Sequence, residues 1–187
     1  MNQTSFYDPD GIAVLAAGMP AAEGREPSMA FDMFLLLDTI PGESVDRMFK
    51  GQTELHAITS GLHNPVMVGS GISDAKPRAD QLVVTKWVDS TSLLLAKALL
   101  TGGKLATGRI SFRKAGDTPD GLVFLTMDLR PVFVNNIQSV TSGTDDRPVE
   151  QVTLAFREIT WTYTRQKPDG TTSQTRYGWS FVNNSPM

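Results

Sequence analysis

One short stretch, residues 32–44, constrains the fold of this chain more than any other. It contains an uninterrupted apolar run at 33–37, and the turn-forming pair Pro41-Gly42 follows. Five apolar residues suit a strand and are too few for the core of a helix. Because the run does not alternate with polar residues, both faces of the strand should be covered. The core can cover one face, and a neighbouring subunit is a natural cover for the other.

A second apolar segment also needs more cover than one side of a domain provides. Asp89, Ser90 and Thr91 can cap the start of a helix and Gly102 suits its end, which predicts a helix at 91–101. Leucine and alanine lie nearly all round its axis, and Lys97 is its only charge. Such a helix is expected to be covered on every side. The helix and the first strand together predict an oligomer.

Alternating and β-branched segments predict about eight strands in all. We expect them at 33–37, 53–59, 82–88, 109–113, 122–129, 132–140, 151–164 and 176–182. Arg130-Pro131 should separate two of them, because proline cannot donate to a ladder. In 151–164 the apolar positions change phase, which predicts a β-bulge or a sharp coil near Arg157-Glu158. The predicted fold class is mainly β: a small antiparallel β-barrel with one flanking α-helix.

The strand at 53–59 is expected to have one partly wet face. Alternation places Leu55, Ala57 and Thr59 on one side and Glu54, His56 and Ile58 on the other.

Two segments lack hydrophobic periodicity. Residues 1–28 contain several glycines and prolines, which predicts a flexible extension. The domain is then expected to begin at Met29 and to span 29–187. The alternative is that Phe6, Tyr7 and residues 12–15 dock on a partner. The second segment, 64–80, is expected to be either a mobile surface loop or a contact arm towards another copy.

Composition excludes several function classes. The net charge is −3, cysteine is absent and only two histidines occur, so nucleic-acid binding, thiol chemistry and a clustered metal site are not expected. No apolar segment approaches the ~18 residues of a membrane span, and residues 12–17 make a poor signal sequence. The nucleophile elbow and the phosphate-loop pattern are missing. We therefore predict no enzyme, with no catalytic, cofactor-binding or metal residue; a β-barrel hydrolase is the minor alternative.

Over 29–182 the chain carries, in this order, the short motifs Ala30-Phe31-Asp32-Met33-Phe34-Leu35, Gly42-Glu43-Ser44, Lys86-Trp87-Val88-Asp89-Ser90-Thr91, Arg113-Lys114-Ala115-Gly116, Glu150-Gln151-Val152-Thr153-Leu154-Ala155-Phe156 and Tyr177-Gly178-Trp179. In their order and spacing, these motifs resemble the haemolysin-coregulated proteins (Hcp), the tube subunits of type VI secretion. The extension 1–28 and the divergent segment 64–80 depart from typical members.

The resemblance implies a subunit that forms hexameric rings. The rings would stack into a tube inside a contractile sheath, beneath a spike, and be expelled with effectors. It also implies no catalytic centre, and export from the bacterial cytoplasm through the type VI apparatus without a signal peptide. The alternative is a secreted or cytosolic ring that carries small effectors in its lumen.

Three sets of residues are the expected contact sites. The subunit interface is expected at Phe34, Leu36, Asp38, Leu94 and Trp161; on the first strand, this favours the face of Phe34 and Leu36 over that of Met33, Leu35 and Leu37. The ring-stacking loop is expected to use Val66, Met67, Ile72, Lys76 and Arg78. Thr59 is expected to face the lumen.

Overall fold

The structure is a computed structural model and describes residues 31–65, 76–114, 120–140, 147–167 and 169–187, with only the backbone of Val140. The predicted extension 1–28 and the predicted stacking residues Val66, Met67 and Ile72 lie outside these ranges.

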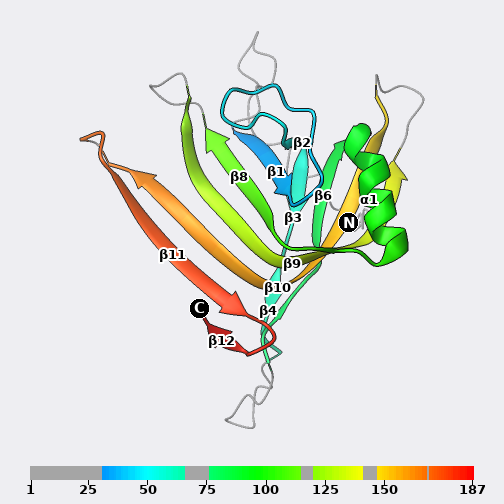
Figure 1. Ribbon diagram of the computed structural model, residues 1–187. Helices are drawn as coiled ribbons and strands as arrows, with labels where there is room; N and C mark the ends of the chain where they lie inside the picture. The colour runs from blue at the N-terminus through cyan, green and yellow to red at the C-terminus, as the bar shows by residue number, and fades with distance from the viewer. Residues whose placement is uncertain (1–30, 66–75, 115–119, 141–146, 168) are drawn as a thin grey trace, which may run out of the picture.

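The described residues form strands and a single helix (Figure 1). The strands are β1 Asp32–Leu37, β2 Thr53–Leu55, β3 Ala57–Thr59, β4 Leu62–His63, β5 Arg78–Ala79, β6 Leu82–Trp87, β7 Lys104–Leu105, β8 Gly108–Lys114, β9 Leu122–Val140, β10 Val149–Gln166, β11 Thr172–Ser180 and β12 Ser185–Pro186. The helix is α1, Ser90–Thr101.

The main sheet is antiparallel and strongly curled. Its strand order is β12-β11-β10-β9-β8-β1-β2, and β10 also pairs with β6, which in turn pairs with β3. The pairings thus run round the sheet and return to β10, although the last step from β2 to β3 is made by the chain and not by a ladder (Figure 1). A mainly β, antiparallel fold with one helix in the described ranges is confirmed, whereas the predicted barrel is not closed: no ladder joins β2 to β3, and we call this break the seam.

The core lies inside this curl. Met33, Leu35 and Leu37 of β1 belong to it, together with the buried side chains of β6, β8, β9 and β10. Leu95 of α1 enters the same core and is almost fully buried. One face of the predicted apolar strand therefore points inward, as expected.

The helix begins and ends where the sequence predicts, within one residue. The carboxylate of Asp89 accepts a hydrogen bond from the backbone N–H of Thr91 (2.9 Å), and the Ser92 hydroxyl accepts one from the N–H of Asp89 (3.0 Å). Gly102 ends the helix with φ 63°, a conformation that costs glycine little.

Pro131 does not break the sheet, so the expected strands 122–129 and 132–140 are one strand, β9. On one side, β9 pairs with β8 from Leu122 to Leu129, and with β7 at Val132 and Phe133. The gap between β7 and β8 therefore lies beside Pro131, and the missing N–H costs no ladder bond there.

The apolar positions of β10 change phase as predicted, and the cause is a coiling of the strand and not a β-bulge at this point. Leu154 and Ile159 lie on opposite faces by the period of two, yet both are buried in the same core cluster. The β9–β10 register continues unshifted from Phe156 to Glu158, so the strand coils between them. The register shift falls earlier, between Thr153 and Leu154, where Asn135 of β9 is the extra residue.

The expected strand 53–59 bends at His56, and the predicted sharing of faces is wrong. Leu55 is buried, whereas Ala57 and Thr59 are exposed. The reason is that β2 pairs with β1 while β3 pairs with β6, so the chain turns between two different partners and changes face.

Candidate functional site

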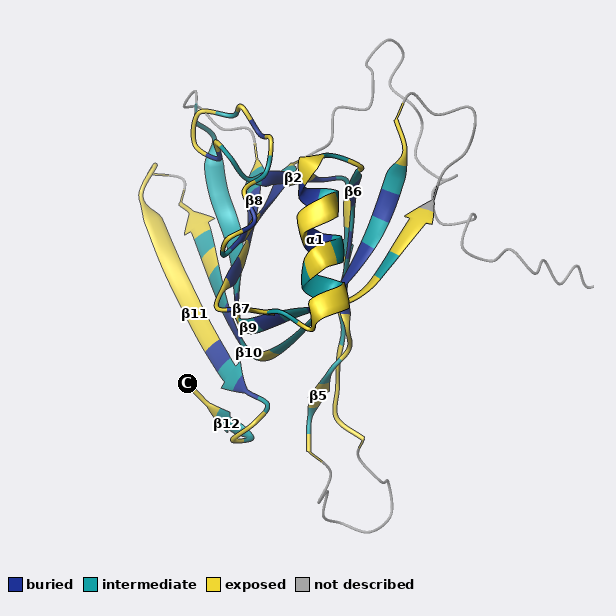
Figure 2. Cartoon of the chain, turned by 45° about the vertical axis from the view of Figure 1, so that its right-hand side comes forward, coloured by how far each residue is buried: buried dark blue, intermediate teal, exposed yellow. Residues whose placement is uncertain are grey.

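The outward face of α1 is apolar and uncovered. Leu93 is 79% exposed and Leu100 is 84% exposed, with Leu94 half-exposed beside them (Figure 2). Lys97, the only charge of the helix, is exposed as well. The chain itself therefore covers only one side of a helix whose sequence predicts cover on all sides. Each leucine that a partner buried completely would contribute roughly 1.5–3 kcal/mol.

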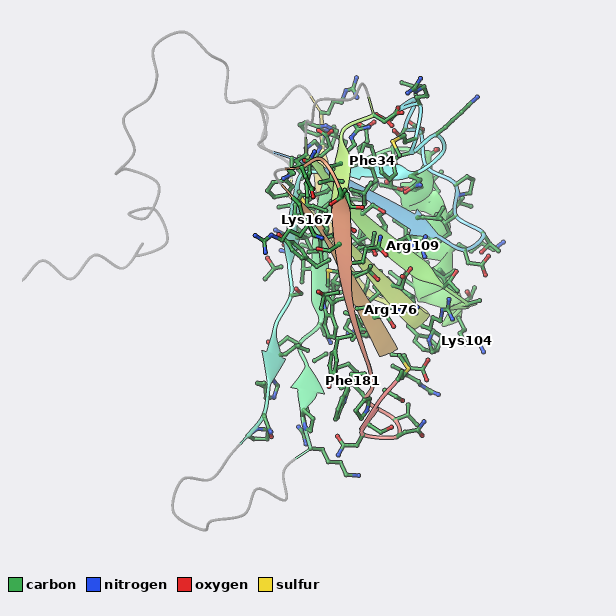
Figure 3. All side chains as sticks on the ribbon, turned by 90° about the vertical axis from the view of Figure 1, so that its left-hand side faces the viewer. Phe34, Lys104, Arg109, Lys167, Arg176 and Phe181 are labelled. Atoms are coloured by element: carbon green, nitrogen blue, oxygen red, sulfur yellow. The ribbon has the colours of Figure 1, made fainter. Side chains whose placement is uncertain are left out.

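The opposite flank is the polar face of the sheet formed by β1 and β8 to β11. It holds a hollow of about 730 Å³, lined by Arg109, Thr126, Asp128, Arg130, Glu158, Thr160, Thr162, Arg176, Tyr177 and Met187. Arg109 and Arg176 lie on this flank, seen face-on in Figure 3, away from α1. Leu36 stands in register with Arg109 and is 44% exposed.

The charges in this hollow alternate in sign. Arg109 Nε lies 2.5 Å from the carboxylate of Asp128. Arg130, Glu158 and Arg176 have no ion-pair partner within the described ranges. Asp38 lies on the neighbouring edge, and its carboxylate accepts a long hydrogen bond from the N–H of Ala106 (3.4 Å).

Phe34, an expected interface residue, is covered by its own chain. Its ring stacks on that of Phe49 at 4.2 Å between centroids, and the guanidinium carbon of Arg113 lies 5.2 Å above it. Phe34 is therefore only 3% exposed. Of the two residues on this face, Leu36 is the one that offers surface to a neighbour.

Trp161 lies in an apolar groove on the other side of the β10–β11 pair. The groove has a volume of about 370 Å³ and is lined by Leu62, His63, Asn64, Pro77, Arg78, Trp161, Tyr177, Trp179 and Phe181. Its wall is the base of the β4–β5 hairpin, which projects from the body of the molecule (Figures 1 and 2).

The remaining expected contact residues are exposed. Lys76 and Arg78 precede and begin β5 on the projecting hairpin. Thr59 ends β3, close to the same hairpin. Leu94 is half-exposed on α1, whereas Leu36 belongs to β1, Asp38 follows β1 and Trp161 belongs to β10.

Sequence reasoning missed a buried ionic cluster. Lys86 is fully buried, and its Nζ lies 2.8 Å from Glu150 Oε1 and 2.8 Å from Asp89 Oδ1. Its only sequence signal is the Lys-Trp-Val-Asp-Ser-Thr motif, in which Asp89 caps the helix that follows.

The described ranges contain no group of three or more histidine, aspartate or glutamate side chains placed to hold a metal ion. Nor do they contain a helix of the length and hydropathy needed to cross a bilayer.

The curled antiparallel sheet, with one flanking helix in the described ranges, defines the class of the chain as mainly β. The family model described as "Type VI secretion system effector, Hcp" matches residues 34–163, and the chain belongs to this family. The resemblance read from the sequence motifs is thereby confirmed. Hcp is a structural, secreted component of type VI secretion.

Similar proteins carry the same name. The chain is 29% identical over 160 residues to protein hcp1 of Pseudomonas aeruginosa strain PAO1, covering 83% of this chain and 98% of that one. A solved structure of a type six secretion system protein is 30% identical with a TM-score of 0.76, covering 84% of this chain and all of that one. Hcp1 from Salmonella typhimurium is 25% identical with a TM-score of 0.70, over 85% of this chain and 100% of that one.

Proposed function

We propose that this chain is the structural subunit of the inner tube of a type VI secretion system. Six copies would form a ring, rings would stack into a tube, and sheath contraction would expel the tube with its effectors. The subunit would be made in the bacterial cytoplasm and leave through the apparatus without a signal peptide. Membership of the Hcp family supports this role.

The observation that carries the proposal is the pair of unlike surfaces on opposite flanks. One is the leucine face of α1, and the other is the polar hollow with Leu36 at its edge. A closed ring needs a heterologous interface, in which two different patches of one subunit meet their counterparts on two neighbours. Two unlike, uncovered surfaces meet that requirement, whereas a two-fold dimer would need only one.

The other contacts follow from the same arrangement. The projecting β4–β5 hairpin, with Lys76 and Arg78, would reach the adjacent ring. Thr59 would line the lumen, where effector proteins travel. The sheath would surround the outside of the tube and the spike would stand at its end.

Sedimentation of the purified chain tests the ring and the leucine face together. We expect the wild type at six times the 20.4 kDa of the chain. Changing both Leu93→Glu and Leu100→Glu would desolvate two carboxylates in the interface, and should shift the protein to the monomer. Val182→Glu, at an apolar residue that is 61% exposed elsewhere, is the matched control and should leave the ring intact.

The outcomes separate two claims. A wild type that sediments as a stable monomer at micromolar concentration would overturn the tube assignment. Intact rings of the double variant would instead remove α1 from the subunit interface.

A further inference from the structure

His56 occupies the seam of the curled sheet. The chain turns here from β2, which pairs with β1, to β3, which pairs with β6. The backbone N–H of His56 donates to the carbonyl of Thr85 on β6 at 2.8 Å. Only the three residues of β3 follow in the β3–β6 ladder, which holds the edge of the sheet at the seam. Because this ladder is short, it depends on the hydrogen bond of His56 that begins it.

The imidazole is packed where a proton would have no partner. The ring packs against the indole of Trp87 in a T-shaped pair, with 4.4 Å between the centroids and 71° between the planes. Nε2 is shielded from solvent and has no hydrogen-bond partner. In the neutral ring, Nε2 can remain a bare lone pair, whereas the imidazolium would place a charged N–H at this atom without an acceptor. A buried, unpaired charged donor costs far more than an unpaired lone pair.

The charges near the ring do not compensate for this burial. Desolvation lowers the pKa of His56 most; Glu54 on β2 raises it, and Lys86 on β6 lowers it further. The two carboxylates beyond Lys86, those of Glu150 and Asp89, are engaged by the Lys86 ammonium. The net direction for the pKa of His56 is downward from its ordinary value.

We propose that His56 is an acid-sensitive latch of the seam. Its neutral ring holds the β2–β3 turn against β6, and its protonation releases the β3–β6 ladder while the rest of the sheet stays paired. This inference concerns the folded chain itself and is independent of ring formation.

The direction of the pH effect follows from linkage. In the open seam, His56 binds its proton near the ordinary pKa of 6.5, whereas the closed seam excludes the proton until a lower pH. The closed state is therefore fully stable above pH 6.5 and loses stability as the pH falls towards the depressed pKa. Once the pH is below the pKa of His56 in both states, each unit by which the closed seam lowers that pKa makes opening about tenfold more favourable.

Amide hydrogen exchange on the full chain tests the latch. Protection at residues 56–59 is compared at about pH 7 and about pH 5, after correction for intrinsic exchange, in the wild type and in His56→Phe. Phenylalanine keeps an aromatic ring against Trp87 but cannot titrate. We expect protection to fall several-fold with acid in the wild type and to stay constant in the variant, while the β9–β10 amides hold in both.

Three results would overturn the proposal: equal loss of protection in wild type and variant, equal loss across the β9–β10 ladder, or an NMR-measured pKa of His56 at or above 6.5. If His56→Phe does not fold, His56→Gln serves as the variant that cannot titrate.

Discussion

Replacing Lys86 with methionine is expected to destabilise the fold more than any change at a surface lysine. The side chain is fully buried, and its Nζ donates to Glu150 Oε1 (2.8 Å), to Asp89 Oδ1 (2.8 Å) and to the carbonyl of Trp87 (2.6 Å). The Ser92 hydroxyl donates to the same oxygen of Glu150 at 2.7 Å. One ammonium thus joins β6, the start of α1 and β10.

The magnitude follows from what remains after the ammonium is removed. Methionine has a similar length, but it leaves the carboxylate of Glu150, which is 4% exposed, without a counter-charge. Breaking a buried ion pair in this way costs about 3–5 kcal/mol. We expect the lower end, about 3 kcal/mol, because Ser92 still donates to Glu150 and the backbone of Thr91 still donates to Asp89. For a chain of this size, that loss lowers Tm by about 6–12 °C.

Thermal and urea denaturation at one fixed protein concentration measure the effect, since assembly would make Tm depend on concentration. Lys104→Met is the matched control: this lysine is exposed on β7, outside the leucine face of α1, so its loss should change stability by less than about 0.5 kcal/mol. Adding Glu150→Leu to Lys86→Met should recover part of the loss, because it removes the unpaired carboxylate. A loss below about 1 kcal/mol in Lys86→Met would refute the reasoning.

Two further predictions concern the loop that covers β1. Phe49→Ala should lower the free energy of unfolding, measured with urea, by about 3 kcal/mol, because the ring is 6% exposed and covers Phe34. The control Met48→Ala, at the neighbouring exposed residue, should lower it by less than about 0.5 kcal/mol. Equal effects of the two variants would show that the stack contributes nothing. Although desolvation raises it, the pKa of Asp46 is lowered overall by hydrogen bonds from the N–H groups of Met48 and Phe49 and from Arg113. The contribution of Asp46 to stability is therefore present above pH 3.8 and is lost as the pH falls through the depressed pKa. In Asp46→Asn, the curve of stability against pH should flatten in this range, and an unchanged curve would contradict the prediction.

Much of the local structure follows from patterns within a few residues. The apolar run at 33–37, the capping residues of the helix and the glycine at its end act through neighbours in the chain, and the strand and the helix that they predict were both found. The phase change in β10 also reports a local property, the face to which successive side chains point. The pattern could not decide whether a bulge or a coiling of the strand brings Leu154 and Ile159 into one core, because the choice depends on the register of β10 with β9.

The contact sites were less predictable for the same reason. The run at 33–37 shows that both faces of β1 need cover, but not that Phe49 of the same chain provides it for Phe34. Likewise, Pro131 is tolerated within β9 only because the gap between β7 and β8 falls beside it.

The sequence by itself determined the mainly β class, the single helix, the absence of recognised catalytic motifs and, through ordered short motifs, the Hcp family. The tertiary structure alone decided which apolar residues remain for a partner, where the seam of the sheet lies, and that Lys86 is buried against Glu150. The physical reason is that pattern and propensity act over a few residues, whereas burial and charge pairing are settled by residues that meet across the sheet, such as 86 and 150, far apart in the chain.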